Sequence, residues 1–178
     1  MLDLVTEVGL AGLTTRRIAE RVGFTEGAIY RHFPTKSALV LALIDRLDEM
    51  LLGPVAEIAA DATLPPRERI ERILRHHAGL ILARESLPIM LLAEAASSGD
   101  PALIERMRSV FGRYVRHVAE VLDEAPGDAS GRRISADALA SLLVGGLAGL
   151  AIHHRLFRDP EFDSRFVGEA IPFVARCS

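Results

Sequence analysis

Apolar residues recur at helical spacing along nearly the whole chain, and no segment shows the sustained alternation of apolar and polar residues typical of a strand. In the segment that begins at Asp100 and Pro101, for example, Met107, Phe111, Tyr114 and Val118 follow one another at intervals of three or four residues. Such spacing places them on one face of a helix, where they can face the core. No internal repeat or low-complexity stretch is visible. The chain is therefore predicted to be all-α, with about nine helices.

Capping residues, glycines and prolines set the expected helix boundaries. Two segments lack a helical pattern, and we expect residues 61–66 to form a linker and 125–133 a surface loop. Pro172 is expected to bend the end of the last helix. The predicted helices are a short one before Gly9, then 14–22, 25–33, one from about 35 that Gly53 and Pro54 break or kink, 67–84, a short one that Ser86 caps, one that opens with Asp100 and Pro101, 135–157 and 162–175.

Residues 14–36 describe two short helices separated by a glycine turn. Thr14 and Thr25 stand where each helix needs an N-cap. Gly23 follows the first helix and Pro34 the second. Two helices of about eight residues joined by such a turn form a helix-turn-helix, whose second helix enters the DNA major groove. The segment holds five Lys/Arg and two Glu in a chain of net charge −3, so positive charge gathers where phosphates would bind. The pattern predicts binding to double-stranded DNA.

The run from Gly9 to Lys36, GLAGLTTRRIAERVGFTEGAIYRHFPTK, closely resembles the N-terminal DNA-binding domain of the TetR family of bacterial repressors. The matching features, at the family's spacing and without gaps, are Gly9, Thr14, Thr15, Ile18, Ala19, Gly23, Tyr30, Phe33 and Lys36. The resemblance covers roughly the first 50 residues, and beyond them only length and helical layout agree. It implies that residues 1–46 form a three-helix helix-turn-helix domain and residues 47–178 a helical domain for effector binding and dimerisation.

Two arguments select the candidate DNA contacts. The first turn of the second helix enters the groove deepest, and small residues there let the backbone approach base edges. The resemblance implies a base contact for Arg16 and phosphate or mixed contacts for Thr15, Tyr30, His32 and Lys36. The predicted DNA-binding residues are Thr15, Arg16, Thr25, Glu26, Gly27, Ala28, Tyr30, Arg31, His32 and Lys36.

Several of these residues have a second interpretation. Tyr30 is alternatively a partly buried core aromatic, and His32 merely an exposed residue. Glu26 either accepts a hydrogen bond from a cytosine amino group or points to solvent. Arg17 and Arg21 are interpreted as solvated face residues rather than DNA contacts.

The charge-poor helix 135–157 is the candidate dimerisation element. Gly145 and Gly149 are four residues apart, and small residues on one face let two helices approach closely. The alternative is close packing inside one subunit. A two-fold dimer presents two recognition helices to a palindromic operator. The predicted interface residues are Leu142, Gly145, Gly146, Gly149, Phe166 and Ala170.

Polar residues on the apolar stripes of three consecutive helices mark a candidate effector site. The predicted effector-binding residues are His77, Met90, Glu94, Met107, Phe111 and Tyr114. Their mainly apolar surroundings suggest a hydrophobic compound such as a lipid, an aromatic or a drug-like molecule. For each polar residue, a satisfied core polar group is the alternative. The pairs at 76–77 and 153–154 are not expected to bind metal, because adjacent histidines do not share a helix face and no acid or Cys follows three or four residues later. No cofactor is predicted.

Composition restricts the remaining classes. The 178 residues are 49% hydrophobic, too many for a disordered chain. A single Cys excludes an intramolecular disulfide and a Cys-based metal site, and it suits a reducing cytoplasm. The longest charge-free run, 138–152, has 15 residues, short of the roughly 20 that span a bilayer. We expect a cytoplasmic protein with no membrane segment.

No nucleophile elbow, zinc-protease motif or phosphate-binding glycine loop is present, so an enzyme is not expected. The resulting hypothesis is a transcriptional regulator that acts as a homodimer, represses from its operator and is released by a small-molecule effector. Activation stays open. The alternative hypothesis is a DNA-binding scaffold of the same fold without an effector.

Only eight residues precede Gly9, and Met1 falls inside the apolar pattern of Leu2, Val5 and Val8. A two-turn helix without an N-cap is marginal by itself. We expect either that translation starts upstream of Met1 or that this protein tolerates a shortened first helix.

Overall fold

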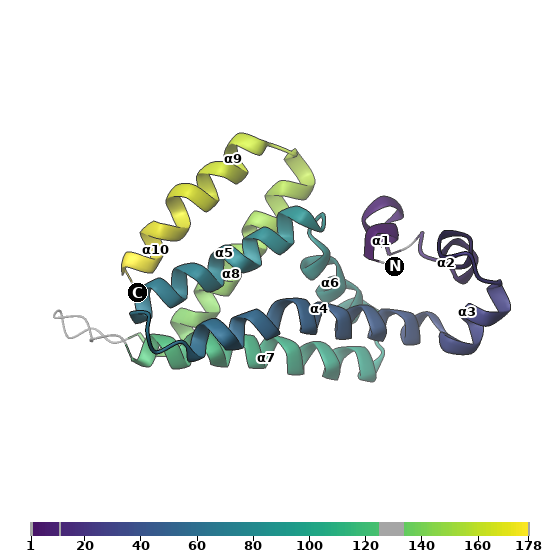
Figure 1. The fold of residues 1–178 in the computed structure, drawn as a ribbon, viewed down its shortest axis with the longest axis horizontal. Coiled ribbons are helices and arrows are strands. Elements are labelled where there is room, and N and C mark those ends of the chain that lie inside the picture. The colour runs from purple at the N-terminus through teal and green to yellow at the C-terminus, as the bar shows by residue number, and fades with distance from the viewer. Residues whose placement is uncertain (1, 11, 125–133, 178) are drawn as a thin grey trace.

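The structure is a computed structural model that describes residues 2–10, 12–124 and 134–177. These residues form helices and connecting turns without a strand, which confirms the all-α prediction (Figure 1). The predicted surface loop at 125–133 lies outside the described residues. The elements are α1 (Leu2–Val8), α2 (Thr15–Val22), α3 (Glu26–His32), α4 (Lys36–Ala60), α5 (Pro66–Ala83), α6 (Leu87–Ser98), α7 (Pro101–Asp123), α8 (Ala136–Phe157), α9 (Pro160–Arg165), the π-helical turn η1 (Phe166–Ala170) and α10 (Ile171–Cys177).

Helices α1 to α3 form a unit at one end of the elongated molecule, around buried apolar residues from all three helices (Figure 1). The predicted caps are confirmed. The side chain of Thr14 accepts from the backbone N–H of Arg17, and that of Thr25 accepts from Ala28, both at 3.2 Å. Gly23 ends α2 with φ 72°, in the left-handed region that a side chain disfavours. Local sequence therefore sets the geometry of the helix-turn-helix.

Helix α4 leaves this unit and runs the length of the other half of the molecule, where it packs along α7 and α5. The domain boundary proposed at residues 46 and 47 falls inside it. One uninterrupted helix therefore carries residues of the DNA end and residues of the larger helical half.

The expected break at Gly53 and Pro54 does not occur, because α4 continues to Ala60. Proline has no N–H, so the carbonyl of Met50, four residues earlier, lacks its helical donor. His76 Nε2 on α5 lies 3.0 Å from that carbonyl oxygen and replaces the donor. A contact from another helix therefore compensates for the proline.

A buried arginine connects the far ends of three helices. Arg69 on α5 is only 3% exposed, although sequence analysis did not single it out. Its guanidinium donates to the carbonyl of Ala59 at 2.7 Å and to the carboxylate of Glu124, which follows α7. That guanidinium holds the pKa of the Glu124 carboxyl below its usual value. Burial of Arg69 is tolerated because its charge is paired and hydrogen-bonded.

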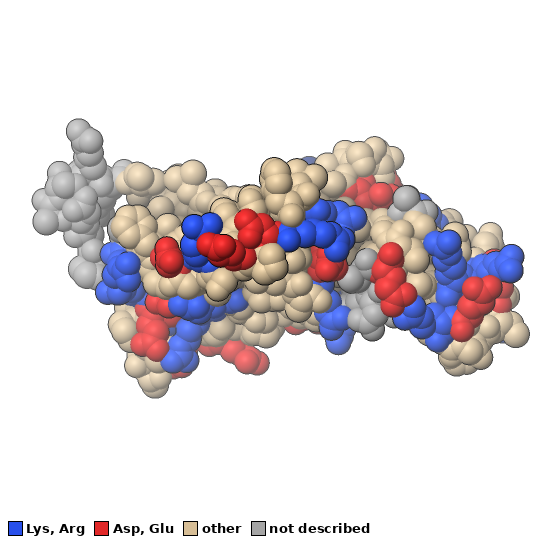
Figure 2. All heavy atoms as spheres, turned by 90° about the horizontal axis from the view of Figure 1, so that it is seen from above, with Lys and Arg blue, Asp and Glu red and all other residues tan. Residues whose placement is uncertain are grey.

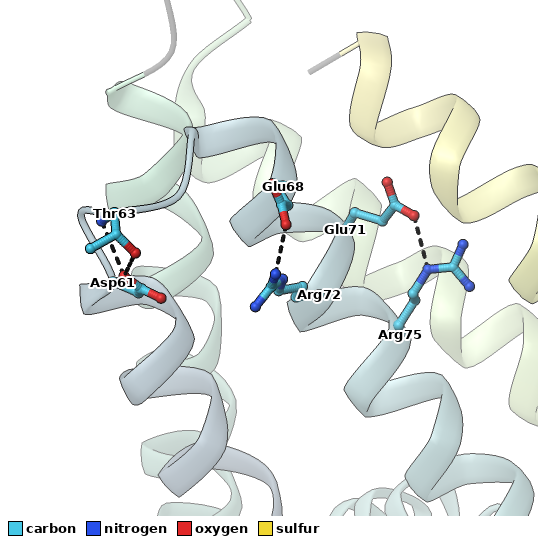
Figure 3. A network of polar contacts seen from close by, with 6 residues as sticks. All are labelled: Asp61, Thr63, Glu68, Glu71, Arg72 and Arg75. Atoms are coloured by element: carbon cyan, nitrogen blue, oxygen red, sulfur yellow. Dashed lines mark hydrogen bonds and ion pairs between the residues drawn. The ribbon is translucent and has the colours of Figure 1, made fainter.

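The other polar contacts at the start of α5 lie on its surface (Figure 3). Asp61 accepts from the backbone N–H of Thr63 at 3.0 Å, which shapes the turn before α5. Arg72 and Arg75 pair with glutamates one turn earlier, Glu68 and Glu71. Such exposed pairs contribute little to stability, so the core and Arg69 hold this end together.

The predicted last helix corresponds to α9, η1 and α10 in direct succession. In η1 the N–H of Ile171 bonds to the carbonyl of Phe166, five residues earlier, instead of the usual four. Pro172 comes next and has no N–H to offer. The change in hydrogen-bond register thus lies directly before the proline that was expected to bend this helix.

The contact between His76 and Met50 generates a stability prediction. His76→Phe is expected to lower the free energy of unfolding by about 1 kcal/mol, because the Met50 carbonyl loses its donor. In a Pro54→Ala background the helix supplies its own N–H at that position, so the same substitution is expected to cost less. Urea titrations of the four proteins measure the difference. Equal costs in the two backgrounds would show that the hydrogen bond does not compensate for the proline.

Candidate DNA interface and effector cavity

Helix α3 exposes its polar residues at the end of the molecule (Figure 1). Buried Ile29 packs it into the N-terminal unit, whereas the Tyr30 side chain is 58% exposed. The interpretation of Tyr30 as a core aromatic is therefore wrong. Arg31 and His32 are exposed as well. The helix presents a surface that another molecule can contact.

Glu26 has a partner inside the protein. Its Oε1 accepts from the hydroxyl of Thr15 at 3.0 Å, which links the first turns of α2 and α3. In the protein without DNA, the Glu26 carboxylate is therefore bonded to Thr15 and does not face solvent alone. Thr25 is occupied as the N-cap of α3. Two predicted DNA contacts thus hold the helix-turn-helix together in the absence of DNA.

Acidic side chains balance part of the positive charge on the N-terminal unit. Arg16 pairs with Glu20 at 3.0 Å, and Arg21 pairs with Glu7. Arg17, interpreted as a solvated residue, donates to the carbonyl of Gly12 at 3.0 Å. Figure 2 shows basic and acidic groups interspersed over this end of the molecule. The positive field is therefore weaker than the count of Lys and Arg predicts.

The start of α4 contacts α6 and the turn that follows it. Lys36 Nζ lies 2.6 Å from Glu94 Oε1 on α6, with side chains 57% and 24% exposed. One residue later, Ser37 hydrogen-bonds to the carboxylate of Asp100 and holds its pKa below the usual value. The structure therefore joins a predicted DNA contact, Lys36, to a predicted effector contact, Glu94.

A cavity of about 230 Å³ lies between helices α4 to α8. Among the described residues that line it, none carries a formal charge, and His77 and Tyr114 are the polar side chains. The lining residues are Leu47, Leu51, His77, Ile81, Pro88, Ile89, Leu92, Met107, Val110, Phe111, Tyr114, Val144, Gly145, Leu147, Ala148 and Ala151. An apolar pocket with few polar groups is typical of a small-molecule site.

His77 and Tyr114 form a buried pair in this lining. His77 Nδ1 lies 3.0 Å from the Tyr114 hydroxyl oxygen, and the two rings meet edge to face. Burial lowers the pKa of His77 to about 3, and neighbouring His76 adds a smaller repulsion. Burial also raises the pKa of Tyr114. Both side chains are therefore neutral at physiological pH.

The structure brings four of the six predicted effector residues together in the cavity: His77, Met107, Phe111 and Tyr114. Met90 and Glu94 lie outside its lining. From α6, the residues that face the cavity are Pro88, Ile89 and Leu92. Because α6 is apolar nearly all round, its sequence does not indicate which side faces the cavity.

The residue before α6 positions that helix. Ser86 stands at the N-cap with φ 64°, a left-handed conformation, and its side chain makes no cap hydrogen bond. Its buried hydroxyl instead donates to the carbonyl of Ala151 on α8 at 2.8 Å. Ser86 is thus the N-cap residue of α6, as expected, but its side chain does not bond to the first turn of that helix. A bond to a cavity-lining residue of α8 sets where α6 begins.

The predicted interface residues on α8 lie on its surface. Leu142 is 65% exposed. Gly145, Gly146 and Gly149 are also exposed, and a Cβ atom at any of the three would meet nothing within 4 Å. Packing inside one subunit therefore does not account for Gly149. Phe166 and Ala170, on η1, are half-buried.

Helix α8 is 22 residues long, longer than its charge-free run. With a mean hydropathy of 1.6 it is long and apolar enough to cross a membrane, and 28% of its most apolar window is buried. Length and composition alone give only weak support for a membrane segment. The exposed apolar face of α8 nevertheless needs a partner of some kind.

The second histidine pair also has contacts that spacing did not reveal. His154 Nδ1 lies 2.7 Å from Asp163 Oδ2, an acid nine residues further along the chain. His153 stacks on Phe162 with ring centroids 3.6 Å apart. Across the described residues, no group of three or more His, Cys, Asp or Glu is arranged to hold a metal ion. These histidines connect α8 to α9.

Comparison with known proteins gives one match at the N-terminal end and others that cover most of the chain. A family model described as "Bacterial regulatory proteins, tetR family" matches residues 2–43, which comprise α1 to α3 and the start of α4. Nucleoid occlusion factor SlmA of Aliivibrio fischeri is 28% identical over 147 residues, which are 82% of this chain and 74% of that protein.

Two solved structures share the fold. A transcriptional regulator from Rhodococcus sp. Rha1 has a TM-score of 0.82 at 23% identity, over 99% of this chain and 90% of that one. FadR from Bacillus subtilis, in complex with stearoyl-CoA, has a TM-score of 0.76 at 16% identity, over 98% of this chain and 92% of that one. The likeness extends over all the helices rather than the helix-turn-helix alone.

Proposed function

Because this chain belongs to the TetR family of bacterial regulatory proteins, we propose that it binds a palindromic operator as a homodimer and is released from it by a small, largely apolar effector. The observation that carries this proposal is the cavity of about 230 Å³ in the same chain as an exposed helix-turn-helix. Repression is the simplest outcome, because an occupied operator blocks access to the DNA.

A second candidate function is a DNA-binding scaffold of the same fold without an effector. The similarity to nucleoid occlusion factor SlmA supports it. A scaffold needs no cavity in its second half, whereas an effector-controlled regulator does. The cavity between α4 and α8 favours the regulator.

We assign DNA contact to the exposed surface of α3 and to the neighbouring basic residues. Gly27 has open space where a Cβ would stand, so the backbone of the first turn can approach base edges. On binding DNA, Arg16 would leave its ion pair with Glu20 and contact a base edge. Lys36, at the start of α4, would contact a phosphate. The recognition helix reads sequence while the cations fix its position.

The occupant we propose for the exposed face of α8 is a second copy of this chain. Two such faces meet across a two-fold axis, and the exposed glycines of α8, of which Gly145 also lines the cavity, allow the helices to approach closely. Exposed Leu156 and Phe157 near the end of the helix supply apolar area to bury. The dimer sets the distance between its two α3 helices.

Helix α6 connects the two activities. It contributes Pro88, Ile89 and Leu92 to the cavity, and on the same helix Glu94 pairs with Lys36. An effector that favours another position of α6 changes this pair and the start of α4. It releases DNA only if that state also holds the recognition helices at a spacing that the operator does not match.

The proposed DNA contacts predict that one substitution lowers affinity for all DNA and that another lowers sequence preference. Lys36→Ala should weaken binding about equally for all sequences and reduce the salt dependence by roughly one unit of slope. Arg16→Ala should relax the preference at one base pair in each half-site by about 1–3 kcal/mol. Fluorescence anisotropy with operator and random duplexes over a salt series measures both. Equal losses on the two duplexes for Arg16→Ala would contradict a base contact.

The ion pair of Lys36 and Glu94 predicts that removal of the carboxylate raises operator affinity. If the Glu94 carboxylate competes with phosphate for Lys36, Glu94→Gln should raise effector-free operator affinity about twofold to fivefold, the scale of an exposed ion pair. In a Lys36→Ala background the gain should disappear. Glu105→Gln is the control, since it removes an exposed carboxylate of α7 that pairs with Arg108 instead. An equal gain in the control would indicate a general charge effect.

The dimer assignment predicts a loss of association without loss of fold. A Cβ atom at Gly149 meets nothing within 4 Å in one protomer, so Gly149→Leu should disturb the protomer little and overpack the proposed interface. Light scattering should show monomer where the parent protein is dimeric, with operator affinity falling in parallel. Gly79→Leu, at an exposed helical glycine of α5, is the matched control and should remain dimeric. A parent protein that is monomeric and binds lipid vesicles would contradict the assignment.

A further inference from the structure

The cavity has a polar end and an apolar rim. His77 and Tyr114 are 7% and 1% exposed, so they lie at its buried end. Leu92 and Phe111 are 37% and 43% exposed and lie at its rim. Leu92, Met107 and Phe111 also line a second hollow of about 200 Å³ between α6 and α7, and Arg108, the one charged residue among the described residues of its lining, is paired with Glu105. An elongated molecule can therefore extend from the His77 end past Leu92 and Phe111.

The contact between the two polar side chains determines which imidazole nitrogen carries hydrogen. Within the described part of the chain, the hydrogen-bond partner of the Tyr114 hydroxyl is His77 Nδ1. If the hydroxyl donates, Nδ1 accepts, and the Nε2 hydrogen and a lone pair of the hydroxyl oxygen remain without partners. If Nδ1 donates instead, the hydroxyl hydrogen and the Nε2 lone pair remain without partners. The two counts are equal, but the first arrangement is favoured because a phenol hydroxyl is a good donor and a neutral imidazole nitrogen is a better acceptor than a phenol oxygen.

In the favoured arrangement His77 presents an unused donor. Its Nε2 is buried and has no hydrogen-bond partner among the described residues. Buried polar atoms nearly always have a partner, and His77 lines the cavity, so a ligand atom is the partner we assign to Nε2. Because Nε2 itself has almost no accessible surface, the ligand reaches it after a small turn of the imidazole ring. That atom must be an acceptor, since neutral imidazole carries its hydrogen on Nε2.

We infer that the cavity binds an uncharged, elongated apolar molecule with one hydrogen-bond-accepting oxygen near its end, and that His77 Nε2 donates to this oxygen. The inference rests on the proposed function, because it names the chemical class of the effector for that site. Carbonyl and ether compounds belong to this class, whereas carboxylates and amines do not.

The lining argues against a charged ligand at the buried end. A carboxylate there would meet no Lys or Arg among the lining residues. It would also meet a neutral imidazole, because burial opposes protonation of His77. An ammonium group would lose its hydration and place its hydrogens against the Nε2 hydrogen. The uncharged acceptor satisfies the imidazole without burying a charge.

A matched set of nine-carbon probes tests the inference: 2-nonanone, nonane, nonanoate and nonylamine. Each competes at pH 7.5 with the neutral fluorescent probe N-phenyl-1-naphthylamine for the full-length protein. We expect 2-nonanone to bind about fivefold to tenfold more tightly than nonane, the scale of one hydrogen bond, and more tightly than both charged probes. Tighter binding of nonanoate or nonylamine than of 2-nonanone would overturn the inference.

Two variants of His77 separate its two nitrogens. In His77→Asn the amide oxygen can take the place of Nδ1 and accept from Tyr114, but no donor reaches the place of Nε2. In His77→Gln the amide nitrogen can take the place of Nε2. The preference for 2-nonanone over nonane should vanish in His77→Asn and persist in His77→Gln. A preference that survives in His77→Asn would overturn the role of Nε2.

The outcomes also distinguish this inference from the proposed function. If all four probes bind alike, the cavity still accepts apolar effectors and only the acceptor requirement falls. If none displaces the fluorescent probe and none changes operator affinity, both fall. Should a variant fail to fold, as circular dichroism would show, the comparison of 2-nonanone with nonane on the parent protein still decides.

Discussion

The continuity of α4 is the constraint on which the rest of the structure depends. Lys36 at its first turn belongs to the DNA end, and Leu47 and Leu51, three to four turns later, line the cavity. A proline inside a helix usually interrupts it, yet here His76 satisfies the carbonyl that Pro54 leaves without a donor. The N-terminal unit and the cavity therefore share one helix, and a displacement at the cavity wall has a direct route to the start of α4.

The polar contacts of the N-terminal unit suit a surface that exchanges partners. Arg16 forms an ion pair with Glu20, and Lys36 forms one with Glu94. The hydroxyl of Thr15 donates to the Glu26 carboxylate. Exposed pairs of this kind are weak, so phosphates and bases can replace the acids at small cost. In the proposed DNA complex such exchange would lower the affinity for DNA of any sequence, because each cation gives up a partner before it gains a phosphate.

The larger helical half contains a polar network around Arg69, the cavity, and the exposed apolar face of α8. At the end far from the N-terminal unit, Arg69 donates hydrogen bonds to the Ala59 carbonyl and to the Glu124 carboxylate. The cavity and the exposed face of α8 are two places where apolar surface is not covered within one chain. Val144, Leu147 and Ala151 of α8 face the cavity, whereas Leu142 and Gly149 face outward. The proposed effector and the proposed association of two chains would therefore act on the same helix.

The sequence by itself determined the features that depend on near neighbours. Thr14, Gly23 and Thr25 specify the helix-turn-helix through caps and one left-handed residue, and the structure places them as expected. The apolar stripes of α5 and α7 were readable for the same reason, because a helical period assigns each residue to a face. His77, Met107 and Tyr114 could therefore be named as candidates before their contacts were known.

Only the tertiary structure decided what depends on residues far apart in the chain. In the structure, Leu92 of α6 lines the cavity, whereas Met90 and Glu94 do not. Because α6 is apolar on almost every side, its sequence alone does not indicate which side faces the cavity. Helix α4 continues past Pro54 with a hydrogen bond between His76 of α5 and the Met50 carbonyl. The ion pair of Glu94 with Lys36 likewise joins two helices. Each of these outcomes rests on a contact between helices, and local periodicity and capping hold no information about which helices will meet.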